Sequence, residues 1–157
     1  MKIARLCLLV VSFALALLAC SPAADIDSPP EIVYGEGMCV QCGMIISEPR
    51  YAAAYLSVDG EPRIFDDLGE LCLYHRDHQE KMATVWAHDF HSEAWIDAEA
   101  ATFVMSENIH TPMSFGIVAF RDREDAALFA EEMQGQLHDF NSFLKACQGN
   151  SQGHDHG

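Results

Sequence analysis

The chain has 157 residues, of which 50% are hydrophobic, and its formal net charge is −15 at pH 7. This length and composition fit one globular domain or two small ones. Nucleic acids and anionic lipid surfaces repel so acidic a protein, so we expect no nucleic-acid partner.

The N-terminus, residues 1–19, has the pattern of a bacterial lipoprotein signal peptide. Lys2 and Arg5 precede an uncharged apolar run, Leu6 to Ala19, which is too short to span a bilayer comfortably. The run ends in Leu-Leu-Ala-Cys, which resembles a lipobox with Cys20 as the acylated residue. Ordinary cleavage near this point, leaving Cys20 as a free thiol, is the alternative. Removal of residues 1–19 takes away two positive charges, so the formal charge becomes −17 (−15 minus 2).

A lipidated Cys20 would hold the chain to the periplasmic side of a bacterial membrane without a transmembrane helix. Ser21, which follows the lipidation site, gives a weak hint of the outer membrane. Residues 20–37 include a small, polar, proline-bearing stretch and are predicted to form a flexible tether. The tail, residues 148–157, is predicted to be disordered.

Residues 38–90 are predicted to form a first ββαβ unit. Asp59-Gly60 signals the turn between its first two strands, and apolar residues recur at helical spacing after the second strand. The expected elements, in chain order, are a strand over 51–58, a strand over 62–65, a helix capped by Asp66 or Asp67, and a strand over 81–90.

Residues 91–147 repeat this order and are predicted to form a second ββαβ unit. The matching joints are Phe65-Asp66-Asp67 and Phe120-Arg121-Asp122. The sequence therefore predicts an α+β fold of two small ββαβ units in tandem, packed as one compact domain. The expected elements of the second unit are strands over 101–106 and 114–120, a helix capped by Asp122 and ended by Gly135, a short strand over 135–140, and a closing helix rich in Phe140, Phe143 and Leu144.

The cysteines leave several pairings open. Cys7 leaves with the signal peptide, and four cysteines remain besides Cys20, which is enough for two disulfides in any of three pairings. Cys72 falls on the predicted buried helix face, so a structural thiol is favoured there. A similar role is expected for Cys147, with an exposed thiol as the alternative. The four are Cys39, Cys42, Cys72 and Cys147.

The Cys-x-x-Cys pair formed by Cys39 and Cys42 allows a redox function. In a thioredoxin-like protein such a pair follows a strand and opens a helix, whose N-terminus lowers the thiol pKa. No long strand is expected before Cys39, and Gly43 interrupts any following helix. A thiol–disulfide redox protein is therefore kept as an alternative only.

A structural zinc module that mediates protein interaction is a second alternative. Zinc needs two further ligands beside a Cys-x-x-Cys pair, and the sequence has no second pair of this kind. Two histidine pairs, His75/His78 and His88/His91, are candidates for those ligands. Surface histidines without a metal are the simpler interpretation of both pairs.

Copper(I) is the third candidate, because this soft ion prefers sulfur donors at low coordination number. Met44 lies two residues beyond Cys42, across flexible Gly43, so a loop can turn Cys39, Cys42 and the Met44 thioether towards one point. Methionine also serves as ordinary core filling, so the residue type does not settle the role of Met44.

The segment Cys-Val-Gln-Cys-Gly-Met-Ile-Ile, residues 39–46, resembles the signature of the NosL family, copper lipoproteins accessory to nitrous oxide reductase. The lipobox upstream, the stretch Arg63 to Tyr74 and the block Thr111 to Phe120 with the helix after it agree with the family pattern. The similarity spans roughly residues 38–140. Ser114 stands where the family usually has glycine.

The resemblance implies a periplasmic copper(I) metallochaperone rather than an enzyme. It would deliver copper for assembly of the copper–sulfide centre of nitrous oxide reductase, with that enzyme and its maturation proteins as partners. The motif implies Cys39, Cys42 and Met44 as copper ligands. Met113, in a loop of the second unit, is a fourth candidate, with a hydrophobic plug as its alternative role. Zinc remains possible in the same site.

The C-terminal tail adds a His-x-His pair, His154 and His156, within an acidic segment. Such a pair binds divalent metal loosely, so we expect at most an auxiliary metal site there.

Overall fold

The computed structural model describes residues 27–149, although not the side chains of the last two of these. The predicted signal peptide, the lipidation site at Cys20 and the tail histidines His154 and His156 lie outside the described residues. Within the described part of the chain, no helix is both long and apolar enough to cross a membrane.

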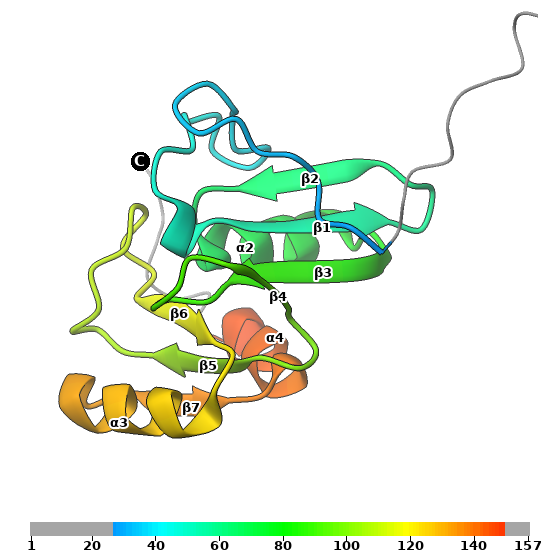
Figure 1. Cartoon of the computed structure of the whole chain (residues 1–157). Helices are drawn as coiled ribbons and strands as arrows, with labels where there is room; N and C mark the ends of the chain where they lie inside the picture. Colours follow the sequence, from blue (N-terminus) through cyan, green and yellow to red (C-terminus); the bar gives the residue numbers. More distant parts are fainter. Residues whose placement is uncertain (1–26, 150–157) are drawn as a thin grey trace, which may run out of the picture.

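The first unit is an antiparallel sheet with one helix against it (Figure 1). A short 3-10 helix, η1 (Pro49–Tyr51), leads into the sheet, whose strand order is β2-β1-β3-β4. The elements are β1 (Ala53–Ser57), β2 (Pro62–Phe65), α2 (Leu68–His78), β3 (Met82–His88) and β4 (Trp95–Asp97).

The second unit has the same topology. Its sheet has the order β6-β5-β7, so the first strand again lies between the second and the third, as β1 lies between β2 and β3. The predicted α+β fold of two ββαβ units is confirmed. The elements are β5 (Thr102–Met105), β6 (Ile117–Phe120), α3 (Arg123–Met133), β7 (Gln136–His138) and α4 (Phe140–Gly149).

The two matching joints cap α2 and α3 in the same way. The Asp67 carboxylate accepts a hydrogen bond from Gly69 N–H at 2.8 Å, and the Asp122 carboxylate accepts one from Glu124 N–H at 2.7 Å. Both side chains thereby satisfy backbone donors that the first helical turn leaves unpaired. The two helices also end alike, each at a glutamine with left-handed backbone, Gln79 and Gln134.

The second sheet is covered on both faces because successive residues of a strand point to opposite sides. Phe103 stacks on Phe143 of α4, with ring centroids 4.3 Å apart, and belongs to the large core shared with the first unit. Its neighbour Val104 packs in a separate cluster with Ala126 and Ala130 of α3. Alternate side chains of β5 thus bind one helix to each face.

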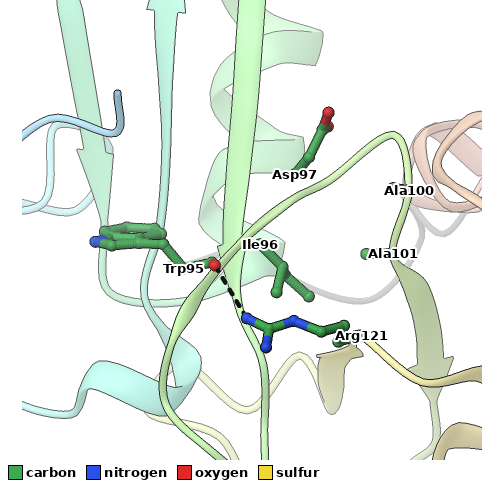
Figure 2. A pocket seen from close by; sticks show the side chains of 6 residues that line it. All are labelled: Trp95, Ile96, Asp97, Ala100, Ala101 and Arg121. Atoms are coloured by element: carbon green, nitrogen blue, oxygen red, sulfur yellow. Dashed lines mark hydrogen bonds between the residues drawn. The ribbon is translucent and has the colours of Figure 1, made fainter. Parts of the chain in front are cut away.

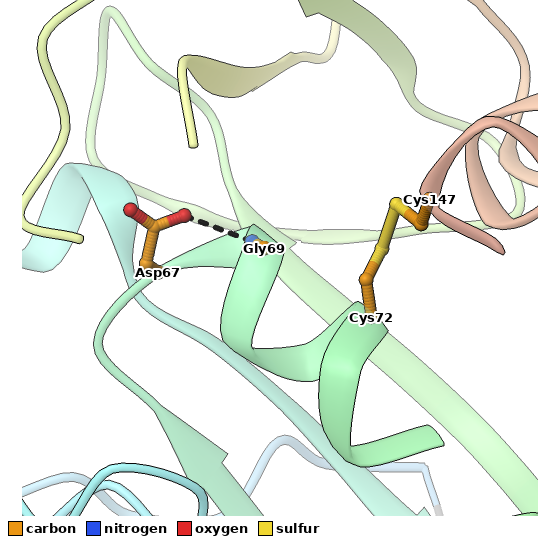
Figure 3. The surroundings of a disulfide bond; sticks show 4 residues. All are labelled: Asp67, Gly69, Cys72 and Cys147. Atoms are coloured by element: carbon orange, nitrogen blue, oxygen red, sulfur yellow. Dashed lines mark hydrogen bonds between the residues drawn. A yellow bond between two sulfur atoms is a disulfide. The ribbon is translucent and has the colours of Figure 1, made fainter. Parts of the chain in front are cut away.

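A disulfide between Cys72 and Cys147 joins α2 of the first unit to α4 at the end of the second (Figure 3). Its cysteines are separated by 75 residues in the chain. Cys39 and Cys42 are free thiols. The expectation of an unpaired structural thiol at Cys72 was wrong, and so was the expectation that Cys147 stays unpaired.

Two predicted boundaries differ from the structure. Ile32 is buried and joins the core, and the Tyr34 hydroxyl lies 2.7 Å from His88 Nε2, so the packed domain begins before residue 38. β4 (Trp95–Asp97) was assigned to the second unit but pairs with β3 in the first sheet. The first unit therefore extends through residue 97.

Candidate metal centre

The two free cysteines lie in a tight loop over residues 38–45, called the cysteine loop below. Met38 and Ile45 pair across its base, and Cys39 N–H donates to the Met44 carbonyl at 2.8 Å. At the tip, Gly43 N–H donates to the Cys39 carbonyl at 2.9 Å, and Gly43 has φ of +74°. Glycine suits this position because L residues with a side chain rarely adopt such a φ. The turn brings the two thiols together.

The loop is attached to the edge of the first sheet beside β2 (Figure 1). Val40 N–H donates to the Ile64 carbonyl of β2 at 3.0 Å. Because β2 ends at Phe65, the residues that follow it, Asp66 and Asp67, lie close to the loop. The Cys42 thiol donates a hydrogen bond to Asp66 Oδ1 at 3.7 Å.

Glu70, in the first turn of α2, completes a three-residue cluster with the cysteines. One donor atom from each of Cys39, Cys42 and Glu70 lies within 4.8 Å of the others. Cys39 and Glu70 are buried, with 2% and 3% of their surface exposed, whereas Cys42 is half-buried. Within residues 27–149, no other group of histidine, cysteine, aspartate and glutamate side chains has this metal-ligand geometry.

Burial keeps both thiols protonated. It raises the pKa of Cys39 to about 12, although hydrogen bonds from nearby backbone N–H groups act in the opposite direction. Burial also raises the pKa of Cys42, and the charges of Asp66 and Glu70 add to the effect. Thiolate is the form that binds metal, so an ion entering the cluster must displace these protons.

Glu70 is held in an environment unfavourable to its charge. Burial, followed by the negative charges of Asp66 and Asp67, raises the Glu70 pKa from 4.5 to about 7. Its Oε2 atom is buried and makes no hydrogen bond within the described structure. Buried polar atoms without a partner are rare because they carry the full penalty of desolvation. A cation between Glu70 and the two sulfurs would give this oxygen a partner.

The predicted thioether ligands belong to two different loops. Met44 shares the cysteine loop, but its side chain is 55% exposed. Met113 belongs to the 106–116 loop of the second unit, and its backbone N–H donates to Asp67 Oδ2 at 3.1 Å. The second unit therefore places Met113 next to the carboxylates at the start of α2. Coordination by either methionine stays a prediction.

The histidines considered for a zinc site do not join the cluster. His88 is buried against Trp95, with ring centroids 3.7 Å apart, and its Nδ1 lies 2.8 Å from the Glu93 carbonyl. His78 is exposed and stacks on Tyr74. His88 thus has a packing role rather than the surface position expected for it.

A shallow cavity of about 320 Å³ lies between β4, the residues that follow it and Arg121 (Figure 2). The Arg121 guanidinium donates to the Trp95 carbonyl at 3.4 Å across its wall. None of its lining side chains offers a sulfur donor, so we do not connect this cavity with the metal cluster. The lining residues are Trp95, Ile96, Asp97, Ala100, Ala101 and Arg121.

The geometry gives little support to a redox function for the cysteine pair. Cys39 and Cys42 lie in a turn before η1 rather than at the start of a helix. Redox-active pairs need a thiol pKa lowered towards neutrality, and here both pKa values are raised.

Comparison with known proteins agrees with this structure. The family model for NosL matches residues 31–146. The crystal structure of the copper chaperone NosL from Shewanella denitrificans superimposes with a TM-score of 0.63 at 21% sequence identity, covering 77% of this chain and 96% of that chain. No curated protein matches the chain significantly.

The fold and the cluster define a two-unit α+β domain with a thiol–carboxylate centre at the entrance to its first helix. The family match covers most of the chain, so this protein belongs to the NosL family.

Proposed function

We propose that this protein is a copper(I) chaperone that binds the ion at Cys39 and Cys42 and transfers it for assembly of the copper–sulfide centre of nitrous oxide reductase. The observation that carries the proposal is the pair of converging free thiols beside the buried Oε2 of Glu70, which has no hydrogen-bond partner. Membership of the NosL family and the fold shared with a copper chaperone support it.

The donor set suits an ion that is carried as cargo rather than kept permanently. Two thiolates provide the soft donors that copper(I) prefers, and the Met44 and Met113 thioethers are proposed to add soft, uncharged donors. Because burial raises both thiol pKa values, protons compete with the ion for the two sulfurs at neutral pH. This moderates retention and favours transfer.

Transfer is proposed to occur by ligand exchange without a redox step. Cys42 is half-buried and Met44 is exposed, whereas Cys39 is buried, so a partner's sulfur or nitrogen donor can approach from the Cys42 side. The incoming donor replaces the Cys42 thiolate first and the Cys39 thiolate last. Each released thiolate takes up a proton, and copper remains in the +1 state throughout.

The site is proposed to act on the periplasmic side of a bacterial membrane, anchored through a lipid on Cys20. The Cys72–Cys147 disulfide supports an oxidising compartment, because disulfides are rare in reducing ones. Nitrous oxide reductase and its maturation proteins are the proposed partners, as the family implies. An auxiliary metal site at His154 and His156 remains a prediction.

Zinc is the second candidate ion, and the Glu70 carboxylate is the observation that favours it. A carboxylate oxygen is a regular zinc ligand but a poor match for copper(I). A structural zinc site would be closed and four-coordinate, which agrees less well with the exposed edge at Cys42. Competition between the two ions in reduced protein under anaerobic conditions distinguishes the two functions.

Cys39→Ser and Cys42→Ser variants test the proposed copper site. Each should weaken copper(I) binding by about 100-fold or more, because a ligand is lost. The affinity is measured by competition with a chromogenic copper(I) chelator under anaerobic conditions. Met44→Leu and Met113→Leu test the thioethers, with Met133→Leu on α3 as the matched control. Unchanged affinity in both serine variants would remove the pair from the copper site.

A further inference from the structure

The exposed apolar side chains of the described structure are concentrated around the cysteine loop. Of eight large hydrophobic residues exposed in the described part of the chain, five fall within residues 33–45, and the other three, Val58, Leu128 and Leu137, are scattered. Single exposed apolar residues need no explanation, but a cluster indicates a binding surface. The five, called the loop patch, are Val33 (51% exposed), Met38 (59%), Val40 (41%), Met44 (55%) and Ile45 (56%).

The backbone holds the loop patch in place. Met38 and Ile45 pair directly across the base of the loop, so their side chains emerge on the same face. Beyond this pair, Gly35 N–H donates to the Ile46 carbonyl, and Ile46 N–H donates to the Gly37 carbonyl, each at 2.8 Å. The patch is therefore preorganised, which lowers the entropy lost when a partner binds.

The segment that carries the patch has charges of one sign. Residues 27–49 contain four acidic residues and no lysine, arginine or histidine, and all four acidic residues are exposed. Two cations lie next to this segment, and both are paired with carboxylates. Arg50 is bound by Glu93 at 2.5 Å, and Arg63, beside the Ile64 that accepts the Val40 N–H, is bound by Glu80 at 2.8 Å. The exposed acidic residues of this segment alternate along the chain with the apolar residues of the patch and are called the acidic surround below; they are Asp27, Glu31, Glu36 and Glu48.

This combination selects the kind of partner. A second copy of the chain would bring the same acidic surround against itself, and an anionic lipid surface would be repelled in the same way. A protein face with an apolar depression ringed by lysine or arginine complements both the loop patch and the acidic surround. We propose that the loop patch is the docking surface for such a partner protein, which receives or supplies the ion at the cysteine loop.

This inference rests on the proposed function for the identity of the cargo, but docking itself is tested without copper. Ile45 and, as the control, Leu128 are replaced one at a time by the photoreactive residue p-benzoylphenylalanine in the full-length chain, in the organism that makes it. Leu128 on α3 is 63% exposed and lies outside the patch. Irradiation and mass spectrometry then identify the cross-linked peptides.

We expect position 45 to give an adduct with one other protein, through a peptide in which apolar residues are flanked by lysine or arginine, and position 128 to give none. The charge reversal Glu36→Lys with Glu48→Lys should lower the yield roughly ten-fold, since like charges across an interface oppose association. The inference is overturned by a yield at position 45 no higher than at position 128, by an adduct with lipid or a second copy, or by a yield unaffected by the charge reversal.

Copper retention by the wild type and by the charge-reversed variant separates this inference from the proposed function. The charge reversal leaves the thiols, Glu70 and both methionines intact, so the variant should bind copper(I) as the wild type does. A specific adduct with a wild-type protein that retains no copper would support docking and refute the copper proposal. Copper binding without the adduct would support the copper proposal and refute docking at the loop patch.

Discussion

Thr111 Oγ1 donates a hydrogen bond to Asp67 Oδ2 at 2.5 Å, across 44 residues of sequence and between the two units of the fold. The same Asp67 oxygen accepts the Met113 N–H, while Oδ1 caps α2 through Gly69. Close packing supports this junction, because a Cβ on Gly69 would lie 1.9 Å from the Phe115 ring. One carboxylate thus begins the helix that carries Glu70 and ties it to the loop that carries Met113.

Asp67→Asn tests this junction. Asparagine caps a helix about as well as aspartate, but its amide nitrogen would face the Met113 N–H, which then loses its acceptor. We expect a loss of about 2 kcal/mol in the free energy of unfolding, measured by urea denaturation. Asp122→Asn is the matched control from the second unit, where the side chain only caps α3, and should change stability by less than about 0.5 kcal/mol. Equal effects of the two substitutions would show that Asp67 acts as a cap alone.

Glu70→Gln should change stability and metal binding in opposite directions. The raised Glu70 pKa means that folding favours the protonated form, so its contribution to stability is complete below pH 4.5 and decreases as pH rises towards 7. Glutamine stays uncharged at every pH, so the variant avoids this decrease in stability. The metal-free variant should therefore be more stable than the wild type at pH 8. The variant should also bind copper(I) roughly ten-fold more weakly, because the negative charge beside the bound cation is lost.

Thermal unfolding at pH 5 and pH 8, with copper(I) competition at pH 8, checks both effects of Glu70→Gln. Glu132→Gln, on an exposed position of α3, is the control and should change neither quantity. A Glu70→Gln variant that is less stable at pH 8, or that binds copper(I) with unchanged affinity, would exclude Glu70 from the role assigned to it.

The order of elements could be predicted from the sequence because the signals involved are local. Both helices begin at aspartates that cap them, and a turn dipeptide separates β1 from β2, so neighbouring residues alone define these boundaries. β4 was missed because Trp95–Asp97 is only three residues long and its position depends on pairing with β3. Ile32 was assigned to the tether because its burial depends on contacts distant in the chain.

Some residues of the site were predicted from the sequence and others were not. The spacing of Cys39 and Cys42 carries the chemistry of the loop, and their convergence follows from a short turn. Glu70 was overlooked because it reaches the thiols only when β2 and α2 fold beside the loop. The sequence did contain a signal for it, namely a glutamate in the first turn of a helix that follows two aspartates, Asp66 and Asp67. The Cys72–Cys147 pair had no local signal at a separation of 75 residues.

Removing the disulfide should separate stability from metal binding. The paired variant Cys72→Ala with Cys147→Ala is expected to lose about 2–4 kcal/mol in the free energy of unfolding, since the unfolded chain is no longer cross-linked. Copper(I) stoichiometry should be unchanged, because Cys72 follows Glu70 by two residues on α2 and side chains at this spacing do not face each other. Urea denaturation and anaerobic titration measure the two quantities. Loss of stoichiometric binding in a variant that remains folded would assign the disulfide to the site.

The anchorage of the segment before the cysteine loop should depend on pH through His88. Burial lowers the His88 pKa below 6.5, and the neutral ring donates from Nδ1 to the Glu93 carbonyl while Nε2 accepts from the Tyr34 hydroxyl. Below pH 6.5 the unfolded chain binds a proton that the folded chain excludes, so stability falls as pH decreases. The Glu93 carboxylate faces the ring and opposes this effect only in part, and Trp95, stacked on the ring, is uncharged.

His88→Gln removes this titration and should weaken the pH dependence of stability. We expect the stability advantage of the wild type over His88→Gln to shrink as pH falls from 7 to 5, measured by urea denaturation at each pH. Taking the difference between the two proteins cancels contributions common to both, including the opposite trend from Glu70. His110→Gln, at an exposed position outside this contact, is the control and should change stability by less than about 0.5 kcal/mol. A constant difference for His88→Gln would mean that the folded protein binds the proton as readily as the unfolded chain, and that Tyr34 remains anchored in acid.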